Sequence, residues 1–110
     1  MKIAAIDIGS NAIRLLIEEV HRHENQWRID KVSLTRVPVR LGDDVFRTGR
    51  ISDEKLRQLV KTMRAFWYLM DVHQVEMFRV CATSAMREAK NRKKVIETVE
   101  REANFRIEIL

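Results

Sequence analysis

The segment Lys2–Ile8 (KIAAIDI) constrains the fold more than any other part of the chain. Its apolar residues point both ways, which is typical of a strand covered on both faces in an α/β protein. Gly9, Ser10 and Asn11 follow it and are turn residues. The branched apolar segment Ala12–Val20 then allows a strand or a short helix by pattern alone. The preceding turn favours a hairpin in which this segment pairs with the first strand.

A third strand and a long helix are indicated by the next pattern. Trp27–Leu41 alternates as a strand does, and Pro38 indicates an edge or the end of that strand. Gly42–Arg50 is punctuated by glycines and is predicted to be a loop. Ser52 is placed to cap a helix that runs to about Val72, because apolar residues recur through it at helical spacing.

The remaining elements complete an α/β prediction. They are a polar loop at His21–Gln26, a strand at Val75–Ala82, a short helical turn at Thr83–Ala89, a helix capped by Asn91 and a final strand at Phe105–Leu110. We therefore expect a mixed sheet with three leading antiparallel strands, followed by the order α-β-α-β. Because a final apolar strand needs a facing layer, we expect an incomplete lobe of a longer protein.

Composition excludes several classes of protein. The chain has 110 residues, the size of one domain, and 45% of them are hydrophobic, which is enough for a core. No apolar run approaches the roughly 20 residues of a membrane span. Cys81 is the only cysteine, so an intramolecular disulfide is excluded. A reducing, cytoplasmic location is the expected setting.

The charge distribution suggests an anionic partner. The chain carries 21 Lys and Arg against 16 Asp and Glu, a net charge of +5. Thr83–Lys94 is the most basic stretch, and it includes Arg87, Lys90, Arg92, Lys93 and Lys94. A nucleic acid, a membrane surface or a phosphate-rich small molecule would suit this balance, and a solvated helix face also accounts for it.

The turn after the first strand is the first candidate site. Gly9 lets backbone amides approach an oxyanion closely, and successive turn amides form an anion nest. Ser10 and Asn11 add side-chain donors. Asp7 repels phosphate unless a divalent cation lies between them, so it is the candidate metal ligand. An ordinary hairpin turn with an Asx hydrogen bond explains the same residues equally well.

Arg14 is the second candidate. In a strand it shares a face with Ala12 and Leu16 and points toward the same mouth as the turn. A bound phosphate would satisfy its guanidinium group. The alternatives are an ion pair with Glu18 and a side chain that simply extends its charged end into solvent.

The third candidate follows a later strand. Thr83 and Ser84 bring two hydroxyls to a helix start, where anions bind readily. Arg87 lies one turn into that helix and has the fork geometry that suits phosphate oxygens. The alternative is that Thr83 or Ser84 is simply a helix N-cap.

Three segments resemble a known family. AAIDIGSNAIRLLI resembles the first phosphate motif of the actin, Hsp70 and sugar-kinase superfamily. CATSAMREAKN and LGDDVFRTGRIS resemble segments of the exopolyphosphatase and guanosine pentaphosphate phosphatase (Ppx/GppA) family. The resemblance implies a ribonuclease H-like (actin-like ATPase) lobe. Residues 1–110 would be the N-terminal part of the first such domain in a longer protein of two or more domains.

The resemblance also implies a function. The expected activity is Mg-dependent hydrolysis of terminal phosphoanhydride bonds in inorganic polyphosphate, or of the 5′-phosphate of guanosine pentaphosphate, in a bacterial cytoplasmic enzyme of the stringent response. The full-length form is expected to be a homodimer without membrane or nucleic-acid partners.

Site residues carry over from the family by their positions in its motifs. Asp7 would hold Mg or its water; the implied phosphate-binding residues are Gly9, Ser10, Asn11, Arg14, Thr83, Ser84 and Arg87. The family's catalytic glutamate would follow Leu110, so this chain alone is expected to be inactive.

Two other functions stay open on the sequence. An actin- or Hsp70-like ATP-driven binding protein would keep the fold, although CATSAMREAKN argues against it. A small nucleic-acid-binding module would use Thr83–Lys94, but that stretch lacks the interleaved aromatic residues that single-strand binders use.

Overall fold

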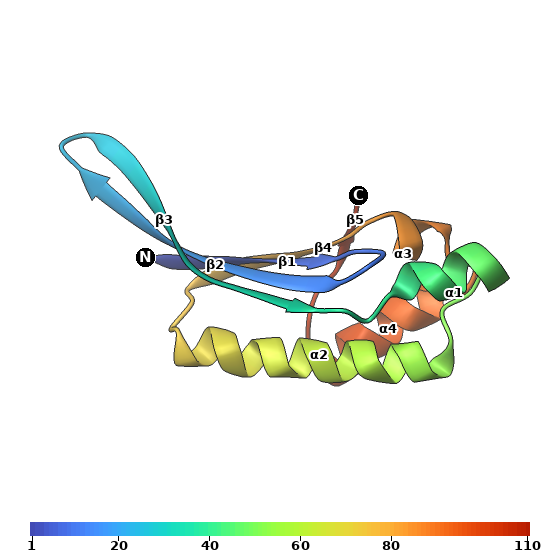
Figure 1. The fold of residues 1–110 in the computed structure, drawn as a ribbon. Coiled ribbons are helices and arrows are strands. Elements are labelled where there is room, and N and C mark those ends of the chain that lie inside the picture. Colours follow the sequence, from blue (N-terminus) through green and yellow to red (C-terminus); the bar gives the residue numbers. More distant parts are fainter.

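A five-stranded mixed sheet organises the computed structural model, which describes residues 1–110 (Figure 1). This confirms the predicted α/β class and its three leading antiparallel strands. The elements are β1 (Lys2–Ile8), β2 (Ile13–His23), β3 (Gln26–Val37), α1 (Leu41–Thr48), α2 (Asp53–Val72), β4 (Met77–Ala82), α3 (Ser84–Glu88), α4 (Arg92–Ala103) and β5 (Glu108–Ile109).

The sheet order is β3-β2-β1-β4-β5. β1 pairs antiparallel with β2, and β2 pairs antiparallel with β3, as expected for strands joined by short turns. β4 lies parallel to β1 on the other side, and β5 lies parallel to β4. Parallel pairing needs a crossover, which α1 and α2 provide before β4. The carboxyl ends of β1, β3 and β4 therefore meet at one edge of the sheet.

The core lies on one face of the sheet. α2 and α4 pack under that face, and α1 and α3 lie at one end of it (Figure 1). Alternate residues of β1 and β2 point into the core, together with apolar side chains of α2 and α4: Ala4, Ile6, Ile8, Ile13, Leu15, Ile17, Leu59, Met63, Phe66, Val95 and Val99. The expectation that β1 is covered on both faces was wrong, because no helix lies on the other face and Ala5 is exposed there.

The β2–β3 hairpin extends well beyond the helices (Figure 1). The predicted polar loop at His21–Gln26 was wrong, because pairing continues to the register pair of His23 and Gln26. Only Glu24 and Asn25 form the turn, with φ of 49° and 65°. Two successive positive φ values are typical of the turns that match strand twist. The two strands thus extend by backbone pairing into polar residues beyond the apolar segments from which they were predicted.

α1 replaces the predicted loop at Gly42–Arg50. Leu41 and Val45 are buried on one side of this short helix, and acidic residues occupy its first turn. Gly49 ends the helix with φ of 79°, a conformation that favours glycine. The glycines therefore mark the start and end of a helix rather than a loop.

Helix starts were predicted better than their capping contacts. The Ser52 side chain accepts a hydrogen bond from the Lys55 amide and caps α2, as predicted. Asn91 stands at the N-cap position of α4 but makes no side-chain cap bond there. Its side chain instead bonds the backbone of Ile51, accepting at 3.0 Å and donating at 2.8 Å. The predicted cap is therefore a tether between α4 and the segment before α2.

The last strands are shorter than predicted. β4 begins at Met77 rather than Val75, and β5 covers only Glu108 and Ile109. Phe105 leaves the strand direction because its ring packs into an aromatic cluster with Trp67 and Phe78, at centroid distances of 4.7 and 5.7 Å. None of the helices has the length and apolarity needed to cross a bilayer.

Candidate functional site

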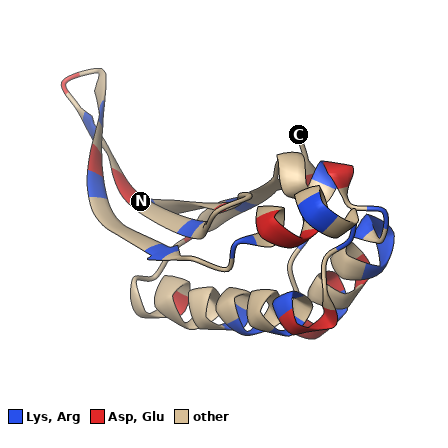
Figure 2. Cartoon of the chain, turned by 45° about the vertical axis from the view of Figure 1, so that its right-hand side comes forward, with Lys and Arg blue, Asp and Glu red and all other residues tan.

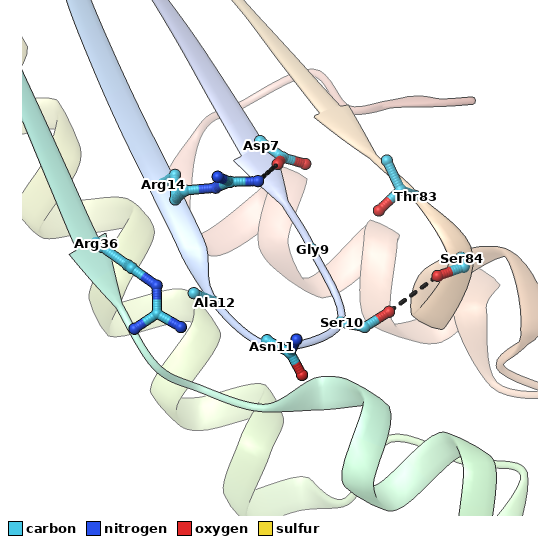
Figure 3. Close-up of a pocket in the computed structure, with 9 residues that line it drawn as sticks. All are labelled: Asp7, Gly9, Ser10, Asn11, Ala12, Arg14, Arg36, Thr83 and Ser84. Atoms are coloured by element: carbon cyan, nitrogen blue, oxygen red, sulfur yellow. Dashed lines mark hydrogen bonds and ion pairs between the residues drawn. The ribbon is translucent and has the colours of Figure 1, made fainter.

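A polar pocket of about 370 Å³ lies where the carboxyl ends of β1, β3 and β4 meet (Figure 3). Only one of its lining residues is hydrophobic. The pocket is lined by Asp7, Gly9, Ser10, Asn11, Ala12, Arg14, Arg36, Thr83 and Ser84. The structure thus brings together seven of the eight residues singled out in the sequence, all except Arg87.

The turn between β1 and β2 forms the floor of the pocket. The Gly9 amide donates to the Ala12 carbonyl at 3.0 Å, and a Cβ on Gly9 would lie 3.0 Å from that same oxygen. The turn therefore favours glycine at this position, because a side chain would crowd the Ala12 carbonyl. The amides of Gly42 and Arg40 donate to the carbonyls of Ser10 and Asn11, at 2.8 and 3.1 Å. The turn's carbonyls are thus occupied from the side of α1.

The amides of Ser10 and Asn11 donate to no backbone carbonyl. Unpaired amides on a tight turn leave partial positive charge at the pocket floor, as in an anion nest. The structure therefore favours the anion-binding interpretation of this turn over that of an ordinary hairpin turn.

Thr83 and Ser84 form a second wall, where β4 ends and α3 begins. The Ser10 and Ser84 hydroxyls share a hydrogen bond of 2.9 Å, which joins two candidate segments distant in the sequence. Thr83 occupies the N-cap position of α3 but makes no side-chain cap bond. The simple capping alternative for Thr83 was therefore wrong, and its hydroxyl lines the pocket instead (Figure 3).

Charged side chains form the third wall. Asp7 is in register with Arg14, and Arg14 is in register with Arg36, so the three lie in one row across β1, β2 and β3. Arg14 Nη2 donates to Asp7 Oδ2 at 3.0 Å. The predicted alternative, an ion pair between Arg14 and Glu18, does not form.

Arg36 is a pocket residue that the sequence reasoning missed. The predicted strand at Trp27–Leu41 contained it, but nothing local in the pattern showed that its end lies beside Arg14. The signal available was topological: a third antiparallel strand ends at the same edge of the sheet as the first strand. A basic residue near that end therefore belongs among the site candidates.

Arg87 does not line the pocket. Its Nη1 donates to the Leu110 carbonyl, and its Nε lies 3.8 Å from a carboxylate oxygen of Glu88. α3 has five residues, so a small change in its direction decides where a side chain one turn along will point. In this chain Arg87 is directed toward the end of β5.

One carboxylate, Asp7, is available to a cation in the pocket. No group of three or more His, Cys, Asp or Glu residues is placed to hold a metal ion. Mg²⁺ commonly keeps several waters and is held by one or two carboxylates together with substrate phosphates. The donor set therefore fits a cation that binds together with a phosphate ligand.

The basic stretch Thr83–Lys94 lies mainly outside the pocket. Figure 2 shows basic residues gathered around the start of α4. Part of this charge is used within the protein, since Lys94 Nζ lies 3.7 Å from Asp53 Oδ1 and Arg92 donates to the Arg87 carbonyl. The stretch therefore behaves largely as a solvated helix end.

The sheet order and one-sided helices define a ribonuclease H-like α/β protein with a polar pocket at the carboxyl ends of three strands. The same fold occurs in Thermus thermophilus RuvC, which matches the whole chain at a TM-score of 0.55 and 11% identity, over 63% of that protein. The profile of the Ppx/GppA phosphatase family matches residues 16–110. The chain belongs to this family.

Relatives with higher identity come from several bacteria. Exopolyphosphatase 2 of Mycobacterium tuberculosis is 36% identical over 83% of this chain and 28% of its own length. The crystal structure of an Aquifex aeolicus family member matches the whole chain at a TM-score of 0.88 and 29% identity, over 35% of that protein. The crystal structure of an exopolyphosphatase from Cytophaga hutchinsonii matches the whole chain at a TM-score of 0.87 and 26% identity, over 34% of that protein. The chain spans about a third of the length of these relatives.

Proposed function

We propose that this chain is part of a phosphohydrolase that cleaves terminal phosphoanhydride bonds, with inorganic polyphosphate or guanosine pentaphosphate as substrate and Mg²⁺ as cofactor. The observation that carries the proposal is the polar pocket, in which free turn amides, three hydroxyls and two arginines converge. These groups bind and orient phosphate oxygens. Membership of the Ppx/GppA family supports the reaction class.

In this proposal the pocket residues position the reacting phosphate. The amides of Ser10 and Asn11 hold phosphate oxygens at the floor, and Ser84 and Thr83 orient them from β4. Positioning and charge stabilisation account for most of the protein's contribution to phosphoryl transfer. Mg²⁺ held at Asp7 would supply charge neutralisation between the carboxylate and the phosphates.

The domain arrangement belongs to the same proposal. Residues 1–110 would form the N-terminal part of the first ribonuclease H-like domain of a longer cytoplasmic enzyme, which we expect to act as a homodimer. Hydrolysis also needs a base to activate water. The pocket's only carboxylate, Asp7, is assigned to Mg²⁺ in this proposal, so we place the base in a segment beyond Leu110, as the family resemblance implies. The chain alone should then bind phosphate compounds and turn them over scarcely.

Phosphate release tests the proposal. The full-length parent protein is offered inorganic polyphosphate and guanosine pentaphosphate with Mg²⁺, beside the 110-residue chain and a parent carrying Ser84→Ala. We expect release by the parent, strong impairment by Ser84→Ala and almost no release by the short chain. Absence of release from both substrates by a folded parent would contradict the reaction class. Turnover by the short chain would contradict the placement of the base.

A further inference from the structure

Arg36 lines the pocket without any partner of its own. It lies near the end of β3 and is exposed, and its side chain forms neither a hydrogen bond nor an ion pair within the chain. Its neighbour across the strands, Arg14, has a different status, since it is held by Asp7 at 3.0 Å. Only Arg14 is paired with the carboxylate, and the positive charge of Arg36 in the same row is uncompensated.

The strand register places the positive charge of Arg36 beside that of Arg14, which destabilises the fold when no ligand is bound. Residues directly opposite on paired antiparallel strands have Cβ atoms about 4.5–5.5 Å apart, and like charges in that arrangement are destabilising. Asp7 relieves the repulsion at Arg14, but Arg36 lies one strand further from the carboxylate. An anion bound beside Arg14 and Arg36 would relieve the remaining repulsion between their guanidinium groups.

The arginines and the hydroxyls occupy opposite sides of the pocket. Figure 3 shows Arg14 and Arg36 on one side, Thr83 and Ser84 on the other, and the turn between them. β3 and β4 are separated by three strand spacings, about 14 Å at about 4.8 Å each. The long arginine side chains shorten this span, and a condensed phosphate, being longer than a single phosphoryl group, bridges it more readily.

We propose, resting on the phosphate-binding function above, that Arg36 holds a second phosphoryl group and makes the pocket selective for condensed phosphates over orthophosphate. The first phosphoryl group lies on the turn amides and the Ser84 side of the pocket. The next phosphoryl group of the same condensed phosphate lies against Arg14 and Arg36. Arg36 is then a specificity residue, and its side chain makes no hydrogen bond to the turn or to the hydroxyl wall.

Calorimetric titration with inorganic tripolyphosphate and with orthophosphate, both in Mg²⁺, tests this role. The proteins are the purified chain, Arg36→Gln, Arg36→Lys and the control Arg28→Gln. Arg28 lies on the same strand and is exposed, but it pairs with Asp30 away from the pocket. We expect Arg36→Gln to weaken tripolyphosphate binding about tenfold, the effect of one charged hydrogen bond, and to change orthophosphate binding less than about twofold. Arg36→Lys should recover part of the loss, and Arg28→Gln should match the unmodified chain.

The outcomes separate this inference from the proposed function. Equal tripolyphosphate affinity in Arg36→Gln and the unmodified chain overturns the role of Arg36 and leaves the phosphate site intact. An equal loss for both ligands overturns the selectivity, because it makes Arg36 a general contributor of charge. If the unmodified chain binds neither ligand, the phosphate-binding function fails and the inference fails with it. Because Arg36 is exposed, circular dichroism should show that all variants are folded.

Discussion

The Ser10 and Ser84 hydroxyls lie 2.9 Å apart, although 74 positions separate these residues in the chain. The bond is partly buried and joins the β1–β2 turn to the start of α3. It holds the floor of the pocket against one wall. A phosphate that contacts both therefore meets donors whose separation is already set, which lowers the cost of ordering them on binding.

We expect Ser10→Ala and Ser84→Ala each to lower the free energy of unfolding by about 1 kcal/mol, the usual contribution of one such hydrogen bond. Because each change removes the same bond, the double variant should lose less than the sum of the two, with a coupling of at least about 0.5 kcal/mol. Urea unfolding of the four proteins measures this. Ser33→Ala, on β3 away from the pocket, is the control. Strict additivity would show that the two hydroxyls act independently.

Asp7→Asn should change the response of the pocket to Mg²⁺. The Asp7 and Arg14 side chains are 39% and 55% exposed, so their ion pair contributes little to stability, at most about 1 kcal/mol. Without the carboxylate, Arg14 is free to bind phosphate and repulsion is reduced. In EDTA, we expect tripolyphosphate to bind Asp7→Asn more tightly than it binds the unmodified chain. We also expect the increase in tripolyphosphate affinity caused by Mg²⁺ to be about tenfold smaller in Asp7→Asn.

Calorimetric titration with and without Mg²⁺ measures this change. Asp30→Asn removes an exposed carboxylate that is also paired with an arginine but lies on the hairpin arm, so it serves as the control. An undiminished Mg²⁺ enhancement in Asp7→Asn would mean that the cation is held elsewhere.

Asn91→Ala should destabilise the whole protein. The side chain of Asn91 accepts from the Ile51 amide and donates to the Ile51 carbonyl, and Ile51 is buried. Removing both partners leaves two backbone groups unsatisfied, at a cost of about 1–3 kcal/mol each if water does not reach them. Urea unfolding should show a decrease in the free energy of unfolding of about 2–6 kcal/mol, the sum for the two groups. Asn91→Asp keeps the acceptor and loses the donor, so its free energy of unfolding should lie between those of Asn91→Ala and the unmodified chain. If Asn91→Ala has the same free energy of unfolding as the unmodified chain, water replaces the contacts of the Asn91 side chain.

Local patterns predicted the parts of the fold that local interactions determine. The turn at Gly9 and the strands beside it were predicted because a tight turn between apolar segments has few other solutions. α1 was missed because Leu41 and Val45 are its only buried apolar side chains, too few to produce a visible helical period. Their burial depends on packing against α3 and the sheet, which the sequence pattern does not contain.

The candidate site shows the same division. Ser10 and Thr83 were found because each follows a strand end that carries small polar residues. Arg36 was missed because its place beside Arg14 follows from the strand register, which includes an irregularity between Ile17 and Glu18. Register is fixed by the packing of the whole sheet. Arg87 was placed at the site by its position one turn into a helix and by the family resemblance, whereas in the structure its side chain lies outside the pocket lining.

A bidentate ion pair fastens β5 to β4. Arg79 Nε and Nη2 donate to the two carboxylate oxygens of Glu108 at 3.1 and 2.6 Å. This hydrogen bonding is the main cause that holds the pKa of Glu108 below its ordinary value of 4.5. β5 has only two residues in strand conformation, so this contact adds to a short stretch of backbone pairing with β4.

Glu108→Gln should therefore reduce stability only where the carboxylate is ionised. Because the folded-state pKa is lowered, the ion pair stabilises the fold fully above the unfolded value of 4.5, and this contribution is lost as the pH falls through the folded-state pKa. Thermal unfolding of both proteins should show a difference in Tm at pH 6 that shrinks steadily below pH 4.5. The pKa of Asp44, lowered chiefly by hydrogen bonding with Ser52, affects both proteins and cancels in the difference. The control Glu97→Gln, on the exposed side of α4, should show no such trend. If the Tm difference between Glu108→Gln and the unmodified chain stays constant across the pH range, packing rather than charge holds β5 in place.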